Sequence, residues 1–335
     1  MLSTSLLTLT DQEMQEFFPD SQALELESLL PSMEHVNPVI SNGDTWKRIL
    51  EKQPEILITG WKTPSLPEQH VREVADNLKY ICHVGGSVRK LVPRAYIEAG
   101  IKVTNWGGTV CHNVAECALL LILSALRRSA YWSIQMHCRG GWKDENLQTE
   151  TLIGKRVGIH GFGYTARSLV NLLKPFQVEI MAHSDCEPDR YFTAMNVRRA
   201  SSLEELFDWA EVMIDLAPGT PDNFHIVDEP LLRRLQENAV FVNIGRGSVV
   251  DTDALLTIAR EGRMQIALDV YEEEPLPKDS GFRGLPNVTL LPHLGGPTVD
   301  FRRNCGLFAL NNLKRYLTGD PLEAEVSLEI YDRAT

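Results

Sequence analysis

The sequence lacks the features that mark several large classes of protein. Its six cysteines form no C-x-x-C pair and no zinc-binding spacing, so we expect reduced intracellular thiols and no metal site. The 33 Lys and Arg residues are outnumbered by 45 Asp and Glu, giving a net charge of −12, which argues against nucleic acid and anionic membranes as partners. The N-terminus has no basic segment typical of a secretory signal, and the longest mainly apolar run, Cys117–Leu126, is too short to span a bilayer. We therefore expect a cytoplasmic globular protein.

The 335 residues, 43% of them hydrophobic, suffice for a full core and two domains. Short apolar runs alternate with helical patterns, which is typical of α/β folds with parallel sheets. A helix from Asn113 to about His137 is expected to connect the domains, and Val299–Leu317 is expected to be a helix packed back on the first. We also expect a helix at Asp44–Lys52, a capping box of Ser202 with Glu205, a helix start at Asp228 and a helix stop at Gly262. We therefore predict a substrate domain of residues 1–108 plus 299–335 and a cofactor domain of residues 109–298. The expected strands are Ser5–Leu9, Glu55–Thr59, Tyr80–Val84, Ile101–Thr104, Arg156–His160, Val178–His183, Glu211–Leu216, Ala239–Ile244, Gln265–Asp269 and Val288–Leu291.

The stretch Ile153–Leu173 carries a glycine-rich turn between an apolar strand pattern and a helical pattern. Gly161 permits a tight turn, Gly163 lets the backbone approach a pyrophosphate, and the small Ala166 allows the helix to pack closely on the strand. Backbone N–H groups at the start of the helix then face the phosphates. A glycine triplet alone is a weak signal, but it follows the first of six expected strands with intervening helices, so we predict a dinucleotide-binding, doubly wound sheet.

Polar residues follow the later strands of this predicted sheet, where ligands of parallel sheets gather. Arg246 lies between two glycines, where its guanidinium could grip a carboxylate or form a structural salt bridge. His293 follows a strand and a proline, and a histidine with a carboxylate partner such as Glu274 is suited to proton transfer near neutral pH. Alternatively, His293 is a surface histidine and Glu274 part of a solvated acidic run. Asp269, at a strand end, could meet a nicotinamide amide or cap a turn.

With these residues assembled, the chain resembles the D-isomer-specific 2-hydroxyacid dehydrogenases over nearly its whole length. The stretches that carry the likeness, besides the glycine turn, are Ala239–Leu255, Ala267–Pro275 and Leu291–His293. The resemblance implies two Rossmann-like domains, a doubly wound parallel sheet for the cofactor and a smaller, flavodoxin-like substrate domain. A glutamate at 274 argues against the formate dehydrogenases of this superfamily, which have glutamine there. The family's cofactor is NAD or NADP, and its members are commonly homodimers.

The resemblance also implies roles for individual residues. Arg246 would bind the substrate carboxylate, His293 would exchange a proton with the substrate oxygen, and Glu274 would pair with His293 and favour its charged form. Asp269 would contact the nicotinamide end of the cofactor, and the backbone of Gly86, Ser87 and Val88 would hold the substrate carboxylate from the first domain. The implied cofactor-binding residues are Gly161, Phe162, Gly163, Tyr164, Thr165, Ser184, Asp185, Ala217, Pro218, Ile244, Asp269, His293 and Gly295.

Three positions depart from the family pattern. Ser184 stands where an aspartate usually holds the adenosine ribose, and Asp185 could serve one residue later, which favours NAD, while the nearby Arg190 leaves NADP open. Arg89 stands where many members have an aspartate, and we hypothesise that it meets a second anionic group on the substrate; a plain surface arginine is the alternative. Leu216 stands where many relatives have a histidine.

The predicted function is the interconversion of a small 2-oxo acid and its D-2-hydroxy acid by hydride transfer. An alternative is a cofactor-sensing binding protein similar to the C-terminal-binding corepressors, which share the fold and retain the arginine, glutamate and histidine. A third reading, a phosphoglycerate dehydrogenase, is disfavoured because the sequence leaves no room for an appended regulatory domain. Candidate substrates are glyoxylate, hydroxypyruvate, pyruvate and branched 2-oxo acids.

Overall fold

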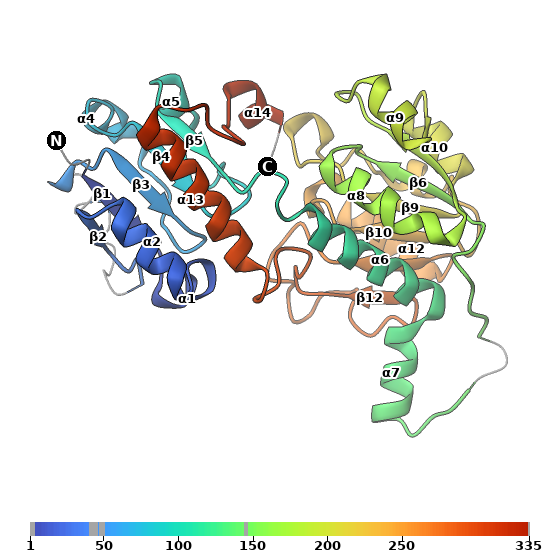
Figure 1. Ribbon diagram of the computed structural model, residues 1–335. Helices are drawn as coiled ribbons and strands as arrows, with labels where there is room; N and C mark the ends of the chain where they lie inside the picture. Colours follow the sequence, from blue (N-terminus) through green and yellow to red (C-terminus); the bar gives the residue numbers. More distant parts are fainter. Residues whose placement is uncertain (1–3, 40–45, 47–50, 144–146, 334–335) are drawn as a thin grey trace. The chain divides into compact units, whose positions relative to one another are not determined.

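The structure is a computed structural model that describes residues 4–39, 46, 51–143 and 147–333. The chain divides into two compact units: Met1–Val110 together with Pro297–Thr335 forms unit 1, and Cys111–Gly296 forms unit 2. The C-terminal segment of the chain is thus part of the same unit as the N-terminal segment (Figure 1).

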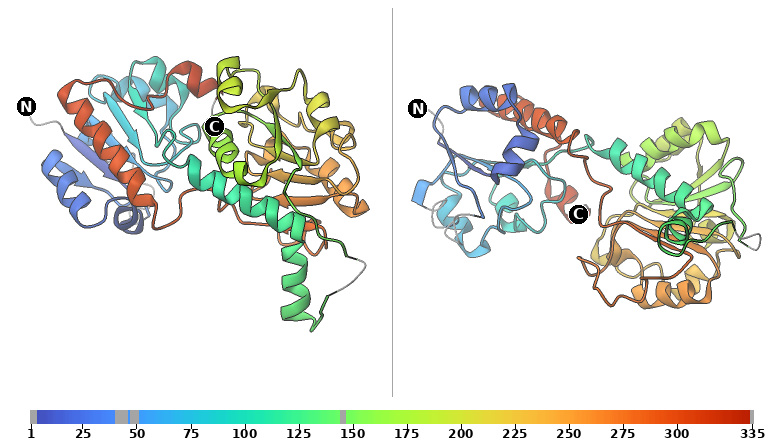
Figure 2. Two further views of the ribbon diagram at one scale, coloured as in Figure 1. Left: turned by 45° about the vertical axis from the view of Figure 1, so that its right-hand side comes forward. Right: turned by 90° about the horizontal axis from the view of Figure 1, so that it is seen from below.

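Unit 1 is built on a five-stranded sheet in which all strands are parallel. Its strand order is the flavodoxin-like order, and the point where the strand order reverses lies between β1 and β3. Helices cover both faces, with α1, α2 and α13 on one and α4, α5 and α14 on the other (Figure 2). The strands, in sheet order, are β2 (Met33–His35), β1 (Ser5–Thr8), β3 (Ile56–Thr59), β4 (Tyr80–His83) and β5 (Lys102–Thr104), and the helices are α1 (Asp11–Phe17), α2 (Ser21–Leu29), α4 (Val71–Val74), α5 (Arg94–Glu98), α13 (Arg302–Thr318) and α14 (Leu328–Arg333).

Unit 2 is built on a seven-stranded parallel sheet with the doubly wound order of dinucleotide-binding domains. Separate hydrophobic clusters fill the two faces, one under α6, α8 and α9 and the other under α10, α11 and α12. The predicted fold class is therefore confirmed for both units. In sheet order the strands are β12 (Val288–Leu290), β11 (Gln265–Leu268), β10 (Val240–Asn243), β9 (Val212–Asp215), β6 (Arg156–His160), β7 (Glu179–His183) and β8 (Arg198–Arg199), and the helices are α6 (Cys111–Arg127), α7 (Ser129–Cys138), α8 (Tyr164–Leu173), α9 (Asp189–Met195), α10 (Leu203–Trp209), α11 (Glu229–Leu232) and α12 (Thr252–Glu261).

The prediction of one continuous helix from Asn113 to His137 was wrong. Arg128 adopts a left-handed conformation with φ of 50° and separates α6 from α7, which are bent by 66° relative to each other. The guanidinium of Arg128 donates to the carbonyl of Gln148, and its backbone N–H donates to Ala125, which together hold the break. Beyond it α7 leaves the core, and none of its residues is buried. Within the described ranges no single helix is long and apolar enough to cross a bilayer, although α6 and α7 together pass that test as a bent pair.

The ten expected strands are all present, and β2, β8, α2 and α14 are additional elements. The predicted helix Asp44–Lys52 falls largely on residues outside the described ranges. The predicted capping box at Ser202 is only half formed. Ser202 Oγ accepts the backbone N–H of Glu205, but the Glu205 carboxylate accepts from the N–H and hydroxyl of Ser201 instead.

Candidate active site

The glycine turn follows β6 and opens helix α8 at the point where the strand order of the sheet reverses, between β6 and β9. Gly161 has a φ of 86°, and a Cβ there would lie 2.9 Å from the backbone of Ala217. Gly163 is the N-cap of α8, no side chain caps the helix, and a Cβ there would meet no atom within 4 Å. The conformation at position 161 therefore requires glycine. At Gly163 the loop offers open space and uncapped N–H groups, and a bound pyrophosphate needs both.

Arg167, in the first turn of α8, fixes the shape of this loop. Its Nη1 donates to the carbonyl of Phe162 and to the carboxylate of Glu187, each at 3.0 Å. Its guanidinium also lies over the ring of Tyr164, which is largely exposed. The Phe162 side chain is buried and stacks on Phe192 with ring centroids 4.3 Å apart. Of the loop residues implied to bind cofactor, Phe162 can therefore offer only its backbone.

We expect Gly163→Ala and Gly161→Ala to separate cofactor binding from stability. Gly163→Ala places a methyl group in open space, so the unfolding midpoint should stay within about 2 °C while NADH binding weakens about tenfold. Gly161→Ala forces an L-residue to a positive φ against Ala217, so it should lower the free energy of unfolding by about 1–3 kcal/mol. Thermal unfolding and NADH titration of both variants would check this. Equal stability losses in the two variants would contradict it.

At the end of β7, Ser184 and Asp185 stand where the ribose of a dinucleotide is held in this fold. The Asp185 side chain is 87% exposed and its Oδ1 lies 3.5 Å from His183 Nε2. An arginine that the sequence pattern did not indicate also reaches this place: Arg199 of β8 donates to the carbonyl of Ser184 at 2.7 Å and pairs with Asp189. The Arg199 charge is thus already balanced by a carboxylate.

A buried histidine–aspartate pair lies beneath the glycine turn and was not predicted. His160 ends β6 and Asp215 ends the adjacent β9, with Nδ1 and Oδ1 3.3 Å apart but without hydrogen-bond geometry. Asp215 Oδ1 accepts the N–H of Ala217 at 2.9 Å, while its Oδ2 is buried with no hydrogen-bond partner within the described residues. The available sequence signal was a polar residue closing each of two otherwise apolar strands. Leu216, Ala217 and Pro218 follow directly, so the pair supports the loop that faces Gly161.

Arg246 follows β10 on a loop whose shape depends on bare backbone. The amide side chain of Asn243 bridges the loop, accepting from Gly245 N–H and donating to the carbonyl of Arg246, both at 3.1 Å. A Cβ on Gly247 would lie 1.9 Å from the carbonyl carbon of Tyr271, so the two loops touch through main chain alone. Burial lowers the pKa of Arg246, and the charge of Glu274 opposes that shift. A partly desolvated guanidinium of this kind gains most from a carboxylate partner.

His293 and Glu274 form a direct pair in unit 2. His293 Nδ1 lies 2.7 Å from Glu274 Oε2, and Glu274 Oε1 accepts the backbone N–H of Tyr271 at 3.0 Å. His293 has a positive φ of 56°, a conformation that is uncommon for a residue other than glycine and that concentrates at functional sites. Both side chains are partly exposed to solvent. The arrangement is an accessible imidazole whose orientation is set by a carboxylate.

Asp269 holds the backbone behind His293. It is buried, its Oδ1 accepts from Leu294 N–H at 2.6 Å, and its Oδ2 accepts from Gly295 N–H at 2.8 Å. A Cβ on Gly295 would touch both Asp269 and the buried Ile244. The contacts of the Asp269 carboxylate are therefore those of a turn cap. Asp269, Ile244 and Gly295 pack together beneath the loop that carries His293.

In unit 1, Gly86, Ser87 and Val88 form a loop after β4. Their three backbone N–H groups donate to no other residue in the described part of the chain, whereas the carbonyl of Gly86 accepts from the Asn105 side chain at 2.7 Å. Successive free N–H groups make a concave site for an anion. The loop rests on His83, whose Nε2 would lie 2.3 Å from a Cβ on Gly85 and whose Nδ1 lies 3.0 Å from Thr59 Oγ1.

Burial lowers the pKa of His83 to about 4, so we expect a pH-dependent stability of unit 1. Between pH 6.5 and about 4 the unfolded chain binds a proton at His83 and the folded chain does not. The free energy of unfolding therefore falls as the pH falls through this window, by up to about 1.4 kcal/mol per pH unit. Urea unfolding should show that the free energy of unfolding decreases less between pH 7 and pH 5 for His83→Gln than for the wild type. Equal decreases would exclude His83 as the cause.

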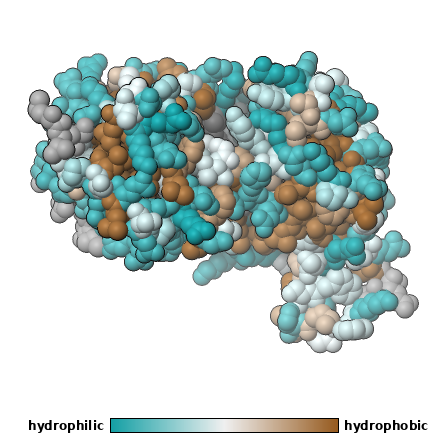
Figure 3. All heavy atoms as spheres, in the orientation of Figure 1, coloured by the Kyte–Doolittle hydropathy of each residue, from teal (hydrophilic) through white to brown (hydrophobic). Residues whose placement is uncertain are grey.

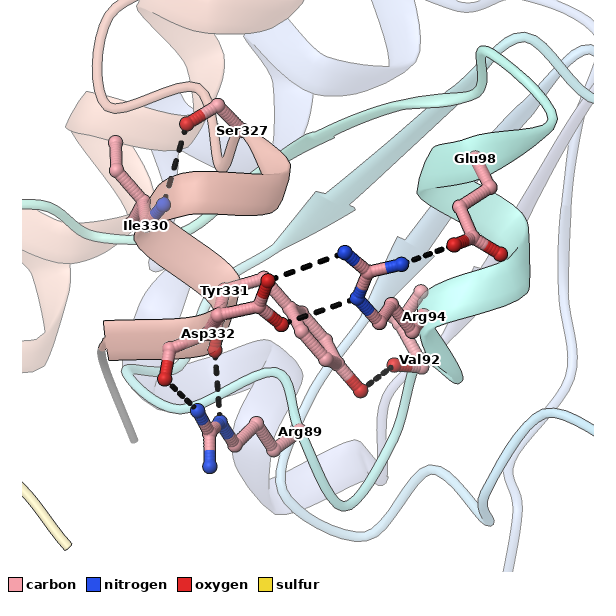
Figure 4. Close-up of polar contacts among 8 residues, drawn as sticks. All are labelled: Arg89, Val92, Arg94, Glu98, Ser327, Ile330, Tyr331 and Asp332. Carbon is pink, nitrogen blue, oxygen red and sulfur yellow. Dashed lines mark hydrogen bonds and ion pairs between the residues drawn. The ribbon is translucent and has the colours of Figure 1, made fainter. Parts of the chain in front are cut away.

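Arg89 contacts the C-terminal helix of unit 1, which the sequence did not indicate. Its Nε donates to the carbonyl of Tyr331 at 2.8 Å, its Nη2 donates to the carbonyl of Asp332, and it lies over the Tyr331 ring (Figure 4). The guanidinium thus satisfies carbonyls at the C-terminal end of α14, which are unpaired in any helix and attract cations. Arg94 holds the same helix through a two-point ion pair with Asp332. Arg89 fastens α14 to the rest of unit 1 and is not a plain surface residue, while its contact with a second anionic group of the substrate stays a prediction.

The residues present in unit 2 fit a dinucleotide. The open side of Gly163, the uncapped start of α8 and the position at the reversal point of a doubly wound sheet are all observed features of this fold. The described ranges contain no group of three or more His, Cys, Asp or Glu side chains that could hold a metal ion.

Comparison with known proteins agrees with this geometry. Residues 119–295 match the family described as "D-isomer specific 2-hydroxyacid dehydrogenase, NAD binding domain". D-3-phosphoglycerate dehydrogenase of Methanocaldococcus jannaschii is 29% identical over 90% of this chain, which spans 58% of that protein. Hydroxyphenylpyruvate reductase of Plectranthus scutellarioides is 34% identical over 67% of this chain and 71% of its own length. Holo D-mandelate dehydrogenase of Rhodotorula graminis has the same fold, with a TM-score of 0.83 at 21% identity over 97% of this chain and 98% of that one.

The family match covers more than half of the chain and contains the glycine turn, the Arg246 loop and the His293–Glu274 pair. The predicted family and the predicted NAD(P) cofactor class are thus confirmed. The chain belongs to the D-isomer-specific 2-hydroxyacid dehydrogenases, the NAD(P)-dependent oxidoreductases that act on a CH–OH group, and unit 2 carries the NAD-binding domain of that family.

Proposed function

We propose that the protein interconverts a small 2-oxo acid and its D-2-hydroxy acid. The observation that carries the proposal is the 2.7 Å contact between His293 Nδ1 and Glu274 Oε2 within an NAD-binding domain. Such a pair can supply one exchangeable proton, which is what reduction of a carbonyl needs besides a hydride.

Each residue has a defined task in this proposal. Glu274 accepts the Nδ1 proton of His293, so Nε2 is the nitrogen that gives a proton to the substrate oxygen in reduction and takes it back in oxidation. In unit 2, Arg246 pairs with the substrate carboxylate and orients the keto group. In unit 1, the free N–H groups of Gly86–Val88 form an anion-binding loop suited to a carboxylate. The nicotinamide of the bound cofactor supplies or accepts the hydride. Asp269 acts through the backbone of Leu294 and Gly295 and is a positioning residue.

We propose NAD(H) as the preferred form of the cofactor. A 2′-phosphate needs an available cation at the end of β7, and the Arg199 guanidinium there is held by Asp189 and by the carbonyl of Ser184. Asp185, which is highly exposed, would repel a phosphate and can accept from ribose hydroxyls.

We also propose a homodimer formed through unit 2. Helix α7 stands away from the core of that unit, contains no buried residue and leaves Ile134 and Met136 each 48% exposed (Figure 1). The space-filling view shows pale and tan spheres among hydrophilic ones at this helix (Figure 3). Exposed apolar side chains on a projecting helix are typical of a surface that a second copy covers. Sedimentation of the purified protein would measure its mass.

The cytoplasmic location and the absence of nucleic-acid and membrane partners stay predictions from composition.

The test of the proposed function is turnover. Purified protein would be mixed with NADH or NADPH and with glyoxylate, hydroxypyruvate, pyruvate, 4-methyl-2-oxopentanoate or phenylpyruvate, and nicotinamide absorbance would be followed. We expect oxidation of NADH with at least one acid and formation of the D-hydroxy acid. NADH binding without turnover of any acid would refute the proposal.

A further inference from the structure

The carboxyl edge of the unit 1 sheet carries two tryptophans on either side of the Gly86–Val88 loop. Trp61 follows β3, the loop follows β4, and Trp106 follows β5. These three strands are neighbours and all parallel, so their following loops meet at one edge. The edge includes the reversal point between β1 and β3, which is where open parallel sheets bind ligands.

Trp106 is packed directly on the loop. Its backbone N–H donates to the carbonyl of Gly85 at 3.1 Å, and the preceding Asn105 side chain donates to the carbonyl of Gly86. A Cβ on Gly86 would lie 2.7 Å from Cζ2 of the Trp106 indole. The absence of a side chain at Gly86 therefore lets the indole lie against the backbone whose N–H groups are free for a carboxylate.

Trp61 is held in place by its neighbours and still faces solvent. Its ring meets Trp106 edge to face, with centroids 5.9 Å apart, and Phe17 in the same way at 5.1 Å. The guanidinium carbon of Arg302 lies 4.9 Å from the Trp61 ring centroid. With three such contacts Trp61 remains 43% exposed. A rigid, exposed indole is suited to bind an apolar partner with little further loss of conformational freedom.

The two arginines near this surface, Arg302 and Arg89, are already engaged. Arg302 pairs with Glu16 and donates to the carbonyl of Pro297, and Arg89 is bound to the carbonyls of α14. A second anionic group on the substrate would have to break one of these interactions to pair with Arg302 or Arg89. An uncharged apolar group needs no such rearrangement and would cover part of Trp61.

We propose that the preferred substrate is a 2-oxo acid with an apolar, aromatic or branched side chain, and that Trp61 and Trp106 bind that side chain. The inference rests on the proposed function, because it assigns the substrate carboxylate to the Gly86–Val88 loop. With the carboxylate there, the next group of the substrate lies beside Trp106, and the edge-to-face tryptophan pair gives it two apolar walls. Trp61 and Trp106 thus determine specificity, while proton transfer is left to His293.

The experiment compares kcat/KM for phenylpyruvate, 4-methyl-2-oxopentanoate and glyoxylate in the wild type, Trp61→Ala, Trp61→Phe and Leu24→Ala. Leu24 is the matched control, since it is another exposed apolar residue of unit 1, on α2. We expect the wild type to prefer phenylpyruvate over glyoxylate at least tenfold. Trp61→Ala should lower kcat/KM for phenylpyruvate about tenfold more than for glyoxylate, mainly through KM. Trp61→Phe should restore most of the preference, and Leu24→Ala should leave it unchanged.

Two results would overturn the inference while leaving the proposed function intact. One is a wild type that turns over glyoxylate as well as or better than phenylpyruvate, and the other is a Trp61→Ala variant that loses the same factor on all three acids. The wild-type preference is measured on the unmodified protein, so it tests the inference even if Trp61→Ala fails to fold. Absence of turnover with every acid would instead remove the proposed function, and this inference with it.

Discussion

His293→Ala is expected to lower kcat for 2-oxo acid reduction about 10³-fold while the Kd for NADH changes less than about twofold. The imidazole is the group proposed to deliver the proton, and removing a positioned general acid typically costs 10²–10⁴-fold in rate. Cofactor affinity should persist because the glycine turn and α8 are separate from the histidine loop in the sheet. Stopped-flow or steady-state kinetics together with NADH titration would measure both quantities.

Unit 2 offers a matched control for this prediction. His225 and Glu272 form a second histidine–glutamate pair, with Nε2 and Oε1 3.1 Å apart and exposures similar to those of His293 and Glu274. His225→Ala should leave kcat unchanged within about twofold, because that pair is assigned no part in proton transfer. Glu274→Gln should give a loss between those of the two histidine variants, since the amide keeps a hydrogen bond but not the charge. Equal rates for His293→Ala and the wild type would exclude His293 as the proton donor.

Arg246→Ala is expected to lower kcat/KM about 10²–10³-fold. The guanidinium is proposed to bind the substrate carboxylate, and truncating one partner of a desolvated charge pair costs about 2–5 kcal/mol. Arg246 is largely buried, and its Nη1 donates to the carbonyl of Gly245 at 2.7 Å. These contacts set the orientation of the guanidinium group. Arg246→Lys should recover little of the loss, because an ammonium group cannot make the planar two-point contact.

The control for Arg246 is Arg233, which makes exposed ion pairs with Glu229 and Glu261 at 2.7 Å. Arg233→Ala should change kcat/KM by less than about twofold, since exposed pairs contribute little and are remote from the proposed chemistry. Saturation curves with phenylpyruvate and glyoxylate at fixed NADH would supply the constants. A full recovery of activity in Arg246→Lys would show that charge alone, rather than two-point orientation, is what the site needs.

The elements with strong local signals could be predicted from the sequence. Gly161, Gly163 and Ala166 lie between an apolar strand and an amphipathic helix, and that order of patterns leaves few folds open. Asp228 and Gly262 were predicted as a helix start and a helix stop, and they cap α11 and α12 as expected. Strands such as β9, β10 and β11 were predicted because each is a short, fully buried and mainly apolar run, whereas β2 and β8 are very short and lack buried residues and were not predicted.

Other features depend on contacts between residues far apart in the chain, which no local pattern encodes. The break at Arg128 is stabilised by the carbonyl of Gln148, twenty residues later, within a sequence that is otherwise continuous in helical pattern. Arg89 binds a helix more than 240 residues away. The His160–Asp215 pair required knowing that β6 and β9 are neighbours. Trp61 and Trp106 likewise became a pair only once β3, β4 and β5 were placed side by side.

The contact between the backbones of Gly247 and Tyr271 limits which substitutions this chain can accept. Any side chain at Gly247 would push the segment that begins at Tyr271 and carries Glu274, so the arginine loop and the glutamate loop cannot be remodelled one at a time. Mutations that adapt the protein to a new acid therefore have to accumulate elsewhere, at positions whose side chains border solvent, such as Trp61. We therefore expect the Arg246 loop and the Glu274 loop to be retained together, while the residues that contact the substrate side chain vary.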